Sequence, residues 1–232
     1  MVRRRTPIRR RVLTPAPGRI VVVGGGATGI ETAAELAEQT DWQVALATAG
    51  TVGPSLSEKA RSHVREVFRR LGVELREGSA VVAPADIDAD AVMWTASLRP
   101  NTELAARAGL TLGADGRIAV DEYLRSVSHP DVYAAGDAAG AWSRQAGLLR
   151  MARATALPVG TRAGRNAAAE LGGGTPGPLR FRYRAQVLSL GRRDGLVQMV
   201  RGDDSPGDRV VRGRLAVVVK EQVVRVLRSA AR

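Results

Sequence analysis

The sequence predicts an α/β fold built on a doubly wound parallel sheet, and three observations lead to that prediction. Short apolar runs alternate with segments of helical periodicity over the first half of the chain. The runs lack the polar alternation of half-exposed strands, which is typical of strands buried in a parallel sheet. A glycine-rich turn joins the first run to the first helical segment, as nucleotide-binding α/β domains require.

Strands and helices are expected to follow one another in a regular order through this region. The expected strands cover residues 19–23, 43–47, 73–75 and 91–95. A helix passes through residues 30–37 after the first strand. A second helix is expected after Ser55 and Glu58, which have the spacing of a capping box. The apolar residues of this second helix repeat at helical spacing and predict one buried face.

In the second half of the chain, the sequence predicts shorter strands and helices. A turn at residues 114–116 precedes expected strands at 117–120 and 131–135. An alanine-rich helix is expected over residues 156–171, ending at three glycines. The last expected elements are a hairpin of residues 181–190 and 196–200, turned at 193–195, and a basic helix at 215–228.

Length and composition exclude several classes of protein. The 232 residues correspond to about one and a half domains. Cysteine is absent, which excludes disulfide frameworks, thiolate metal sites and dithiol redox centres. The only histidines are His63 and His129, so we expect no metal site. There is no apolar run of the ~20 residues that span a bilayer.

The net charge of +12 does not by itself predict a nucleic-acid partner. All but two of the 35 cationic residues are arginines, and six of them lie in the first eleven positions. Aromatic residues are only 3% of the chain, which leaves few rings to stack on single-stranded bases. The basic tail also lacks the apolar core of a signal peptide. We therefore expect no nucleic-acid partner and a cytoplasmic protein.

The glycine-rich turn carries the most informative motif of the sequence. Gly24, Gly26 and Gly29 have the GxGxxG spacing, follow a strand and open a helix. The first glycine permits the tight turn. The second allows a pyrophosphate to approach the backbone, and the third allows the helix to pack closely on the strand. Exposed N–H groups at the helix start then bind the phosphates. The similar spacing at residues 172–177 follows a helix instead, and we interpret it as a helix end and linker.

The sequence leaves the choice between NAD and NADP open. An acidic residue ~20 positions after the glycine motif would bind an NAD ribose, but the second strand ends without one, at Thr48. Arg61 and Arg65 have the charge to bind a 2′-phosphate. The alternative, which we favour, is that both lie on the solvated face of their helix.

Several motifs resemble the two-dinucleotide flavoprotein oxidoreductases, and the type II NADH dehydrogenase group in particular. The glycine turn with its flanks is similar to the NAD(P)H-binding turn of that family. The matching segments are residues 21–33, 92–96, 99–100, 116–121, 129–139 and 156–160. The segment His129–Ala139 resembles the family's second flavin motif and is the most specific of these. Residues 188–195 and 219–221 resemble the C-terminal region of an actinobacterial branch.

The resemblance implies NAD(P)H and FAD as cofactors and assigns roles to particular residues. Backbone around the glycine turn would hold the NAD(P)H pyrophosphate, and Glu31 would lie near the nicotinamide. Asp137 would accept a hydrogen bond from the ribityl chain of FAD, beside Gly136. The full set of cofactor-binding candidates is Gly24, Gly25, Gly26, Ala27, Thr28, Gly29, Glu31, Ala96, Ser97, Gly136, Asp137, Ala156 and Leu157. Ala156 and Leu157 would offer backbone N–H groups to the flavin. No catalytic acid or base is implied, because hydride transfer belongs to the cofactors.

Two departures from the family pattern affect these expectations. Family members begin with an FAD-binding half that carries its own glycine motif, whereas here the NAD(P)H motif is reached within 24 residues. We expect a shortened form that holds FAD weakly or not at all. Ser97 stands where the family usually has glycine, next to the nicotinamide side. The expected regions are a disordered basic tail (1–18), an NAD(P)H-binding Rossmann domain (19–113), the C-terminal part of an FAD domain (114–177) and a small α+β region (178–232).

Two functions of different classes follow. The first is an FAD-dependent NAD(P)H oxidoreductase that passes hydride to flavin and on to an acceptor such as a quinone, with a separate FAD-domain partner or a homodimer as alternatives. The second is a non-catalytic NAD(P)-binding or regulatory module. The basic C-terminal helix, with Val217, Val218 and Lys220, could lie on a membrane surface at the inner face of the cell membrane. We favour the alternative that it packs on the preceding hairpin.

Overall fold

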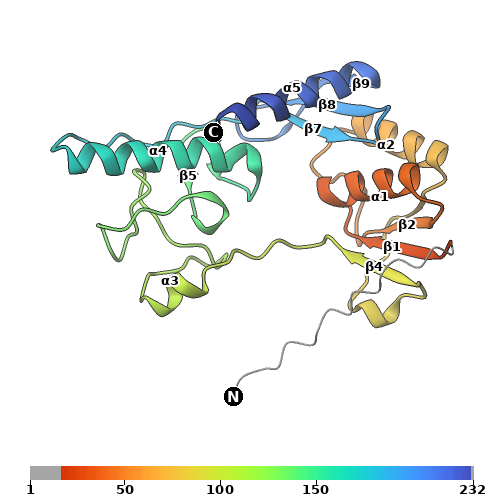
Figure 1. Cartoon of the computed structure of the whole chain (residues 1–232), viewed down its shortest axis with the longest axis horizontal. Helices are drawn as coiled ribbons and strands as arrows, with labels where there is room; N and C mark the ends of the chain where they lie inside the picture. Colours follow the sequence, from red (N-terminus) through yellow and green to blue (C-terminus); the bar gives the residue numbers. More distant parts are fainter. Residues whose placement is uncertain (1–16, 231–232) are drawn as a thin grey trace.

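The computed structural model describes residues 17–230, with only the backbone described at residues 223, 224 and 226–230. The predicted basic tail therefore lies outside the described residues except for Pro17 and Gly18. A parallel sheet with helices α1 and α2 lies on the right of Figure 1, and the long helix α4 lies at the opposite end. Strands β7–β9 and helix α5 lie along the top, between the two.

The parallel sheet has four strands in the order β3-β2-β1-β4. They are β1 (Arg19–Val23), β2 (Gln43–Ala47), β3 (Glu74–Arg76) and β4 (Ala91–Trp94). Val23, the last residue of β1, is in register with Ala47 on one side and with Trp94 on the other. The carboxyl ends of these strands therefore meet at one edge. The predicted fold class and the order of the first elements are confirmed.

One face of the sheet is covered by α1 (Ala27–Gln39) and α2 (Glu58–Leu71). The buried side chains of this core include Val22, Ile30, Leu46, Val64 and Phe68. The other face carries Val21, Val23, Ala45 and Ala47 and is covered by side chains from the connection between β3 and β4, such as Val81 and Ile87. That connection contains only a short 3-10 helix, η1 (Pro84–Asp86).

The N-terminal cap of α2 differs from the expected capping box. Ser57, and not Ser55, is the N-cap residue, and its hydroxyl accepts a hydrogen bond from the Ala60 N–H. Ser55 instead donates its hydroxyl proton to Gln186, in a distant part of the chain. Ser55 and Glu58 have the right spacing, but the tertiary contact takes the hydroxyl away from the helix.

The middle of the chain contains few regular strands. Its elements are α3 (Glu103–Arg107), η2 (Gly136–Ala138), the two-residue strands β5 (Trp142–Ser143) and β6 (Gly147–Leu148), and α4 (Arg153–Leu171). The strands expected at 117–120 and 131–135 are wrong as continuous strands. Ile118, Val120 and Tyr133 take part only in isolated bridges, each to a different segment, so no ladder extends along either run.

The C-terminal region is an antiparallel sheet with a helix packed on it. It comprises β7 (Ala185–Ser189), β8 (Gly195–Val200), β9 (Pro206–Arg212) and α5 (Arg214–Ala230), with β8 in the centre. The predicted hairpin is confirmed, although its first strand begins at Ala185. The strand β9 was not predicted, because it begins with Pro-Gly-Asp, three residue types that are depleted in strands. Helix α5 contacts all three strands, which agrees with the prediction that it packs on the preceding hairpin.

This C-terminal sheet packs directly against α1 and α2. Leu188, Leu190 and Leu196 belong to the same buried core as the helices of the parallel sheet. Polar contacts reinforce the packing: the side-chain oxygen of Gln198 accepts a hydrogen bond of 2.6 Å from the Ser57 N–H. The two sheets thus share one core, with α1 and α2 between them.

Candidate functional site

The glycine turn begins directly after β1 and is fixed by its contacts with the neighbouring strands. Gly24 has φ +123°, a conformation that residues with a side chain rarely adopt. Its N–H donates to the Ala47 carbonyl oxygen at 2.8 Å. A Cβ atom at this position would lie 2.8 Å from the Ala96 N atom, so only glycine fits. The turn is thereby held at the edge where β1, β2 and β4 end.

Gly29 allows the helix to approach the turn closely. A Cβ atom there would overlap the carbonyl oxygen of Gly24, and it would also lie 2.9 Å from the Thr95 hydroxyl. Gly25 is equally confined, because a Cβ atom there would lie 2.7 Å from the hydroxyl oxygen of Thr48. The glycines at both ends of the turn are therefore required by packing.

The start of α1 is open to solvent and unsatisfied. Gly26, Ala27 and Thr28 are exposed, and nothing lies within 4 Å of a Cβ atom placed on Gly26. The first intrahelical bond runs from the Ile30 N–H to the Gly26 oxygen, so the preceding N–H groups have no helical acceptor. The described structure gives this helix no capping side chain and no acidic residue in its first turn. Such a helix start favours an anion.

Ala96 and Ser97 lie beside the turn, just after β4. Thr95 fixes this segment to β1, because its N–H and its hydroxyl both donate to the Val23 oxygen at 2.8 Å. Ser97 has φ +67°, in the left-handed region. The position therefore favours glycine for its backbone conformation, which explains the glycine expected there from the family pattern.

At the end of β2, where a ribose-binding acid was expected, charged residues are paired with one another. Arg61 is bound to Glu58 and to the Leu56 oxygen. Arg65 is bound to Glu58 and to Glu77. The hydrogen bond from Arg65 is the main cause that lowers the pKa of Glu77. Both arginines are thus committed to carboxylates, and both are only partly exposed, so they are not simply solvated as the favoured interpretation had it.

Glu77 is a residue that the sequence analysis missed at this edge. Its carboxylate accepts a hydrogen bond of 2.7 Å from the Val52 N–H, in the loop that follows β2. A signal for it existed, because Glu77 follows β3 directly and the carboxyl ends of parallel strands lie together. Glu77 supplies the carboxylate that β2 itself lacks at this edge.

Glu31, expected near the nicotinamide, contacts the C-terminal region. Its carboxylate accepts a hydrogen bond of 2.8 Å from the Ser189 N–H and forms an ion pair with Lys220. Ser189 ends β7, and Lys220 lies on α5. In this structure Glu31 therefore connects the dinucleotide-binding helix to the C-terminal sheet and helix.

The flavin-side candidates form a second group around η2 and α4, which contact each other. Gly136 has φ +68°, and a Cβ atom there would meet nothing within 4 Å. Asp137 is exposed, and no side-chain hydrogen bond or ion pair of Asp137 is found in the part of the chain that the structure describes. An open left-handed glycine followed by an unengaged carboxylate fits a polar chain such as the ribityl group.

The role assigned to Ala156 needs correction. Helix α4 begins at Arg153, three residues earlier than predicted. The N–H of Ala156 donates to the Ala152 oxygen at 3.0 Å and is therefore used within the helix. The first helical residues, Arg153 and Ala154, are the ones whose N–H groups lack a helical acceptor. Leu157 is exposed but lies one turn inside α4, so it is not at the helix start where the unused N–H groups are.

The structure thus brings the candidates together in two separate groups. One comprises the glycine turn with Ala96 and Ser97, at the edge of the parallel sheet. The other comprises Gly136, Asp137 and the start of α4, and α1 and α4 lie at opposite ends of the view in Figure 1. Among the described residues, no three acidic or histidine side chains gather as a metal site. No helix in that same part of the chain is long and apolar enough to cross a bilayer.

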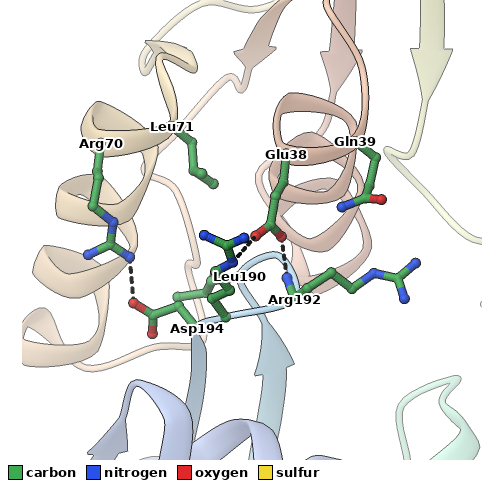
Figure 2. Close-up of a pocket in the computed structure, with 8 residues that line it drawn as sticks. Glu38, Gln39, Arg70, Leu71, Leu190, Arg192 and Asp194 are labelled. Atoms are coloured by element: carbon green, nitrogen blue, oxygen red, sulfur yellow. Dashed lines mark hydrogen bonds and ion pairs between the residues drawn. The ribbon is translucent and has the colours of Figure 1, made fainter.

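A further pocket of about 600 Å³ lies between the carboxyl ends of α1 and α2 and the β7–β8 loop, and its charges are paired (Figure 2). Asp194 receives a hydrogen bond of 2.6 Å from Arg70 and lies 3.0 Å from the His63 ring. Burial raises the pKa of Asp194, but the Arg70 and His63 bonds outweigh it and place the pKa below the ordinary value. Glu38 accepts from the Arg192 N–H. These contacts join the C-terminal sheet to the helices.

The fold is that of a dinucleotide-binding α/β protein, and comparison with known proteins identifies the family. Residues 6–156 match the family described as pyridine nucleotide-disulphide oxidoreductase. The chain belongs to this family.

Relatives and solved structures agree with that assignment. An NADH dehydrogenase-like protein of Mycobacterium tuberculosis is 32% identical over 200 residues, which cover 77% of this chain and 50% of the relative. A nitric oxide reductase FlRd-NAD(+) reductase of Citrobacter koseri is 32% identical over 136 residues, or 52% of this chain and 35% of the relative. The chain spans about half the length of the first of these relatives and a third of the second.

Two solved structures share the fold, each at 26% sequence identity. The putidaredoxin reductase in its covalent complex with putidaredoxin matches with a TM-score of 0.62 and 26% identity, over 80% of this chain and 47% of that one. The water-forming NADH oxidase from Lactobacillus brevis, bound to NADH, matches with a TM-score of 0.60 and 26% identity. The match covers 78% of this chain and 42% of that one.

Proposed function

We propose that this chain is part of an NAD(P)H-dependent flavoprotein oxidoreductase of the NADH dehydrogenase-like kind. It binds NAD(P)H at the glycine turn, and the hydride passes to FAD and then to an acceptor such as a quinone. The membership of the family and the NADH dehydrogenase-like relative support this assignment. The NADH bound in the Lactobacillus brevis oxidase supports the nicotinamide cofactor.

The observation that carries the proposal is the exposed, uncapped start of α1. Ala27 and Thr28 present N–H groups without a helical acceptor, next to a Gly26 that has open space around it. A dinucleotide pyrophosphate carries the negative charge that this helix end favours. Ala96 and Ser97 flank the turn from β4 and would contact the nicotinamide half of the cofactor.

Gly136 and Asp137 are the residues we assign to the flavin. The open space at Gly136 leaves room for a pyrophosphate–ribityl chain, and the Asp137 carboxylate would accept a hydrogen bond from a ribityl hydroxyl. The start of α4, with Arg153 and Ala154, would direct its unused N–H groups toward the flavin carbonyl end. Flavin, when bound, supplies the chemistry of accepting the hydride. The chain's own part is to orient both cofactors.

The nature of the acceptor and of further partners is the finer part of the proposal. The acceptor we propose is a quinone at the inner face of the cell membrane, as the family resemblance implies. The putidaredoxin complex of a structural neighbour supports acceptor proteins as the alternative. A separate FAD-domain partner and a homodimer are the two further partners that we propose.

A substitution at Gly26 separates dinucleotide binding from folding. Gly26 has φ −76° and open space around it, so Gly26→Ala leaves the fold intact but places a methyl group where the pyrophosphate must approach. Titration of NADH and of NADPH against tryptophan fluorescence reports binding, because Trp94 lies in register with Val23 at the site. We expect saturable quenching that weakens at least tenfold in the variant, with an unchanged melting temperature. No saturation with either nucleotide would contradict the proposal.

A second measurement distinguishes the oxidoreductase from a non-catalytic binding module. We expect the purified chain to be colourless, and a stoichiometric flavin absorbance band would contradict that expectation. With FAD supplied under anaerobic conditions, NADH should bleach the flavin absorbance, and Asp137→Ala should slow the bleaching. Dinucleotide binding without any flavin reduction would favour the binding module.

A further inference from the structure

A second pocket, of about 320 Å³, lies between α4 and the segment that precedes β7. Helix α4 is at the far end of the molecule from the glycine turn in Figure 1. The pocket wall combines three arginines with an apolar part. The main lining residues are Arg162, Arg165, Arg180, Leu157, Pro158 and Leu179. No acidic side chain lines it.

The surrounding segment carries a concentrated positive charge. Residues 141–184 contain eight arginines and a single acidic residue, Glu170, so this stretch alone has a net charge of +7. Glu170 is bound to Arg125, outside the stretch. The positive charge of the molecule is thus unevenly distributed and is high around α4. One of the eight arginines, Arg150, forms an ion pair with Asp204 outside the stretch. The charge that is left favours the binding of a counter-charge.

The three arginines of the pocket differ from the other pocket arginines in having no ionic partner. Within the described part of the chain, Arg162, Arg165 and Arg180 form no ion pair with a carboxylate. In the pocket of Figure 2, by contrast, Arg70 is bound to Asp194, Arg192 to Glu35, and Arg193 lies near Glu38. The charges of that pocket are used to hold the protein together, whereas those of the α4 pocket are available to a ligand.

We propose that the α4 pocket binds a phosphate group of a ligand that also has an apolar part. Three guanidinium groups match the charge of a phosphate or diphosphate, which they bind through paired N–H donors. Leu157, Pro158 and Leu179 provide an apolar wall for the remainder of the ligand. No aromatic side chain lines the pocket, so the stacking that single-stranded nucleic acid needs is missing. The phosphate is that of a soluble organic phosphate or of a lipid headgroup.

The test compares two double variants of the whole chain that remove the same charge. The variant R162Q/R165Q removes two pocket arginines. The control R107Q/R209Q removes two exposed arginines, on α3 and β9, that likewise form no ion pair within the described residues. Saturating NADH is present throughout, so that the glycine turn is occupied. The probes are pyrophosphate, by titration calorimetry, and sedimentation with vesicles of equal parts phosphatidylglycerol and phosphatidylcholine.

We expect R162Q/R165Q to bind the effective probe at least about tenfold more weakly, as expected for lost charge-assisted hydrogen bonds, while the control changes little. A loss with pyrophosphate assigns the pocket to soluble phosphates, and a loss only with vesicles assigns it to a lipid headgroup. Either result supports the proposal. Binding of neither probe, an equal loss in both double variants, or displacement of pyrophosphate by FAD would overturn it.

Discussion

Glu31 on α1 and Lys220 on α5 form an ion pair although 189 residues separate them in the chain. The same carboxylate oxygen accepts the Ser189 N–H at 2.8 Å. The helix that begins at the glycine turn is therefore fixed to both the last strand residue of β7 and the C-terminal helix. A residue expected to lie near the nicotinamide has a structural role in joining two parts of the protein.

This ion pair predicts a similar loss of stability when either of its two members is replaced. Lys220→Met should lower the free energy of unfolding by about 1 kcal/mol, because it removes the cation from a partly exposed pair. It should leave NADH affinity unchanged. Glu31→Gln should cost a similar amount, and the double variant little more than either single one, measured by urea unfolding. A fall in NADH affinity in Glu31→Gln alone would indicate that Glu31 also contacts the nucleotide.

Gly29→Ala should destabilise the protein and abolish dinucleotide binding together. The new methyl group would overlap the Gly24 oxygen, so the helix must shift away from the turn. We expect a loss of about 3 kcal/mol, the cost of overpacking at a confined site. Gly164→Ala on α4 is the matched control, because nothing lies within 4 Å of a Cβ atom there. It should stabilise its helix by roughly 0.5–1 kcal/mol, and equal melting temperatures for both variants would contradict the packing argument.

The left-handed backbone of Ser97 predicts an order of stability among three side chains. Ser97→Val should lower the free energy of unfolding by about 1–2 kcal/mol, since a β-branched residue tolerates φ +67° poorly. Ser97→Gly removes the strain, but it also raises the conformational entropy of the unfolded chain, which lowers the free energy of unfolding by about 0.4–1 kcal/mol. The net effect on stability should therefore be small. Urea denaturation checks this order. A valine variant as stable as the wild type would be inconsistent with the conformation.

The pairing of Asp194 predicts a pH-dependent part of the stability. Its pKa is lower in the folded chain than in the unfolded chain, because Arg70 and His63 outweigh the effect of burial. The carboxylate therefore stabilises the fold above its unfolded pKa of about 3.9, and this stabilisation is lost as the pH falls through the lower folded value.

Asp194→Asn should cost about 2–3 kcal/mol near neutral pH, since it leaves the Arg70 guanidinium without its carboxylate at a mostly buried position. The difference from the wild type should shrink as the pH falls below about 4, because the carboxyl group is protonated first in the unfolded chain and, at a lower pH, in the folded chain. Asp208→Asn, an exposed substitution on β9, is the control and should change little at any pH. Chemical unfolding at a series of pH values measures both. A difference that stays constant down to pH 2 would contradict the assignment.

Elements that depend on neighbours in the sequence were predicted well. The strands β1 and β2 are apolar runs whose burial follows from their composition, and α1 follows the glycine motif directly. The hairpin of β7 and β8 carries its turn residues between its two strands. The glycines with similar spacing at residues 172–177 follow the end of α4, and Gly172 is its C-cap, as expected.

Features that depend on distant segments were missed or misplaced. The hydroxyl of Ser55 binds Gln186, so the N-cap of α2 is Ser57 and not the predicted Ser55. The runs at 117–120 and 131–135 have strand-like composition, but each finds only isolated bridges, since no long neighbouring strand lies beside them. The strand β9 forms despite its composition because β8 offers an open edge next to it.

The sequence by itself determined the parallel sheet, the glycine turn and the family, because each depends on residue types within a few positions of one another. Only the tertiary structure decided where the charged side chains point. It directed Glu31 to Lys220, paired Arg65 with Glu77, and left Arg162, Arg165 and Arg180 without a carboxylate among the described residues. The physical reason is that an ion pair depends on distances between segments far apart in the chain, and only packing fixes these distances.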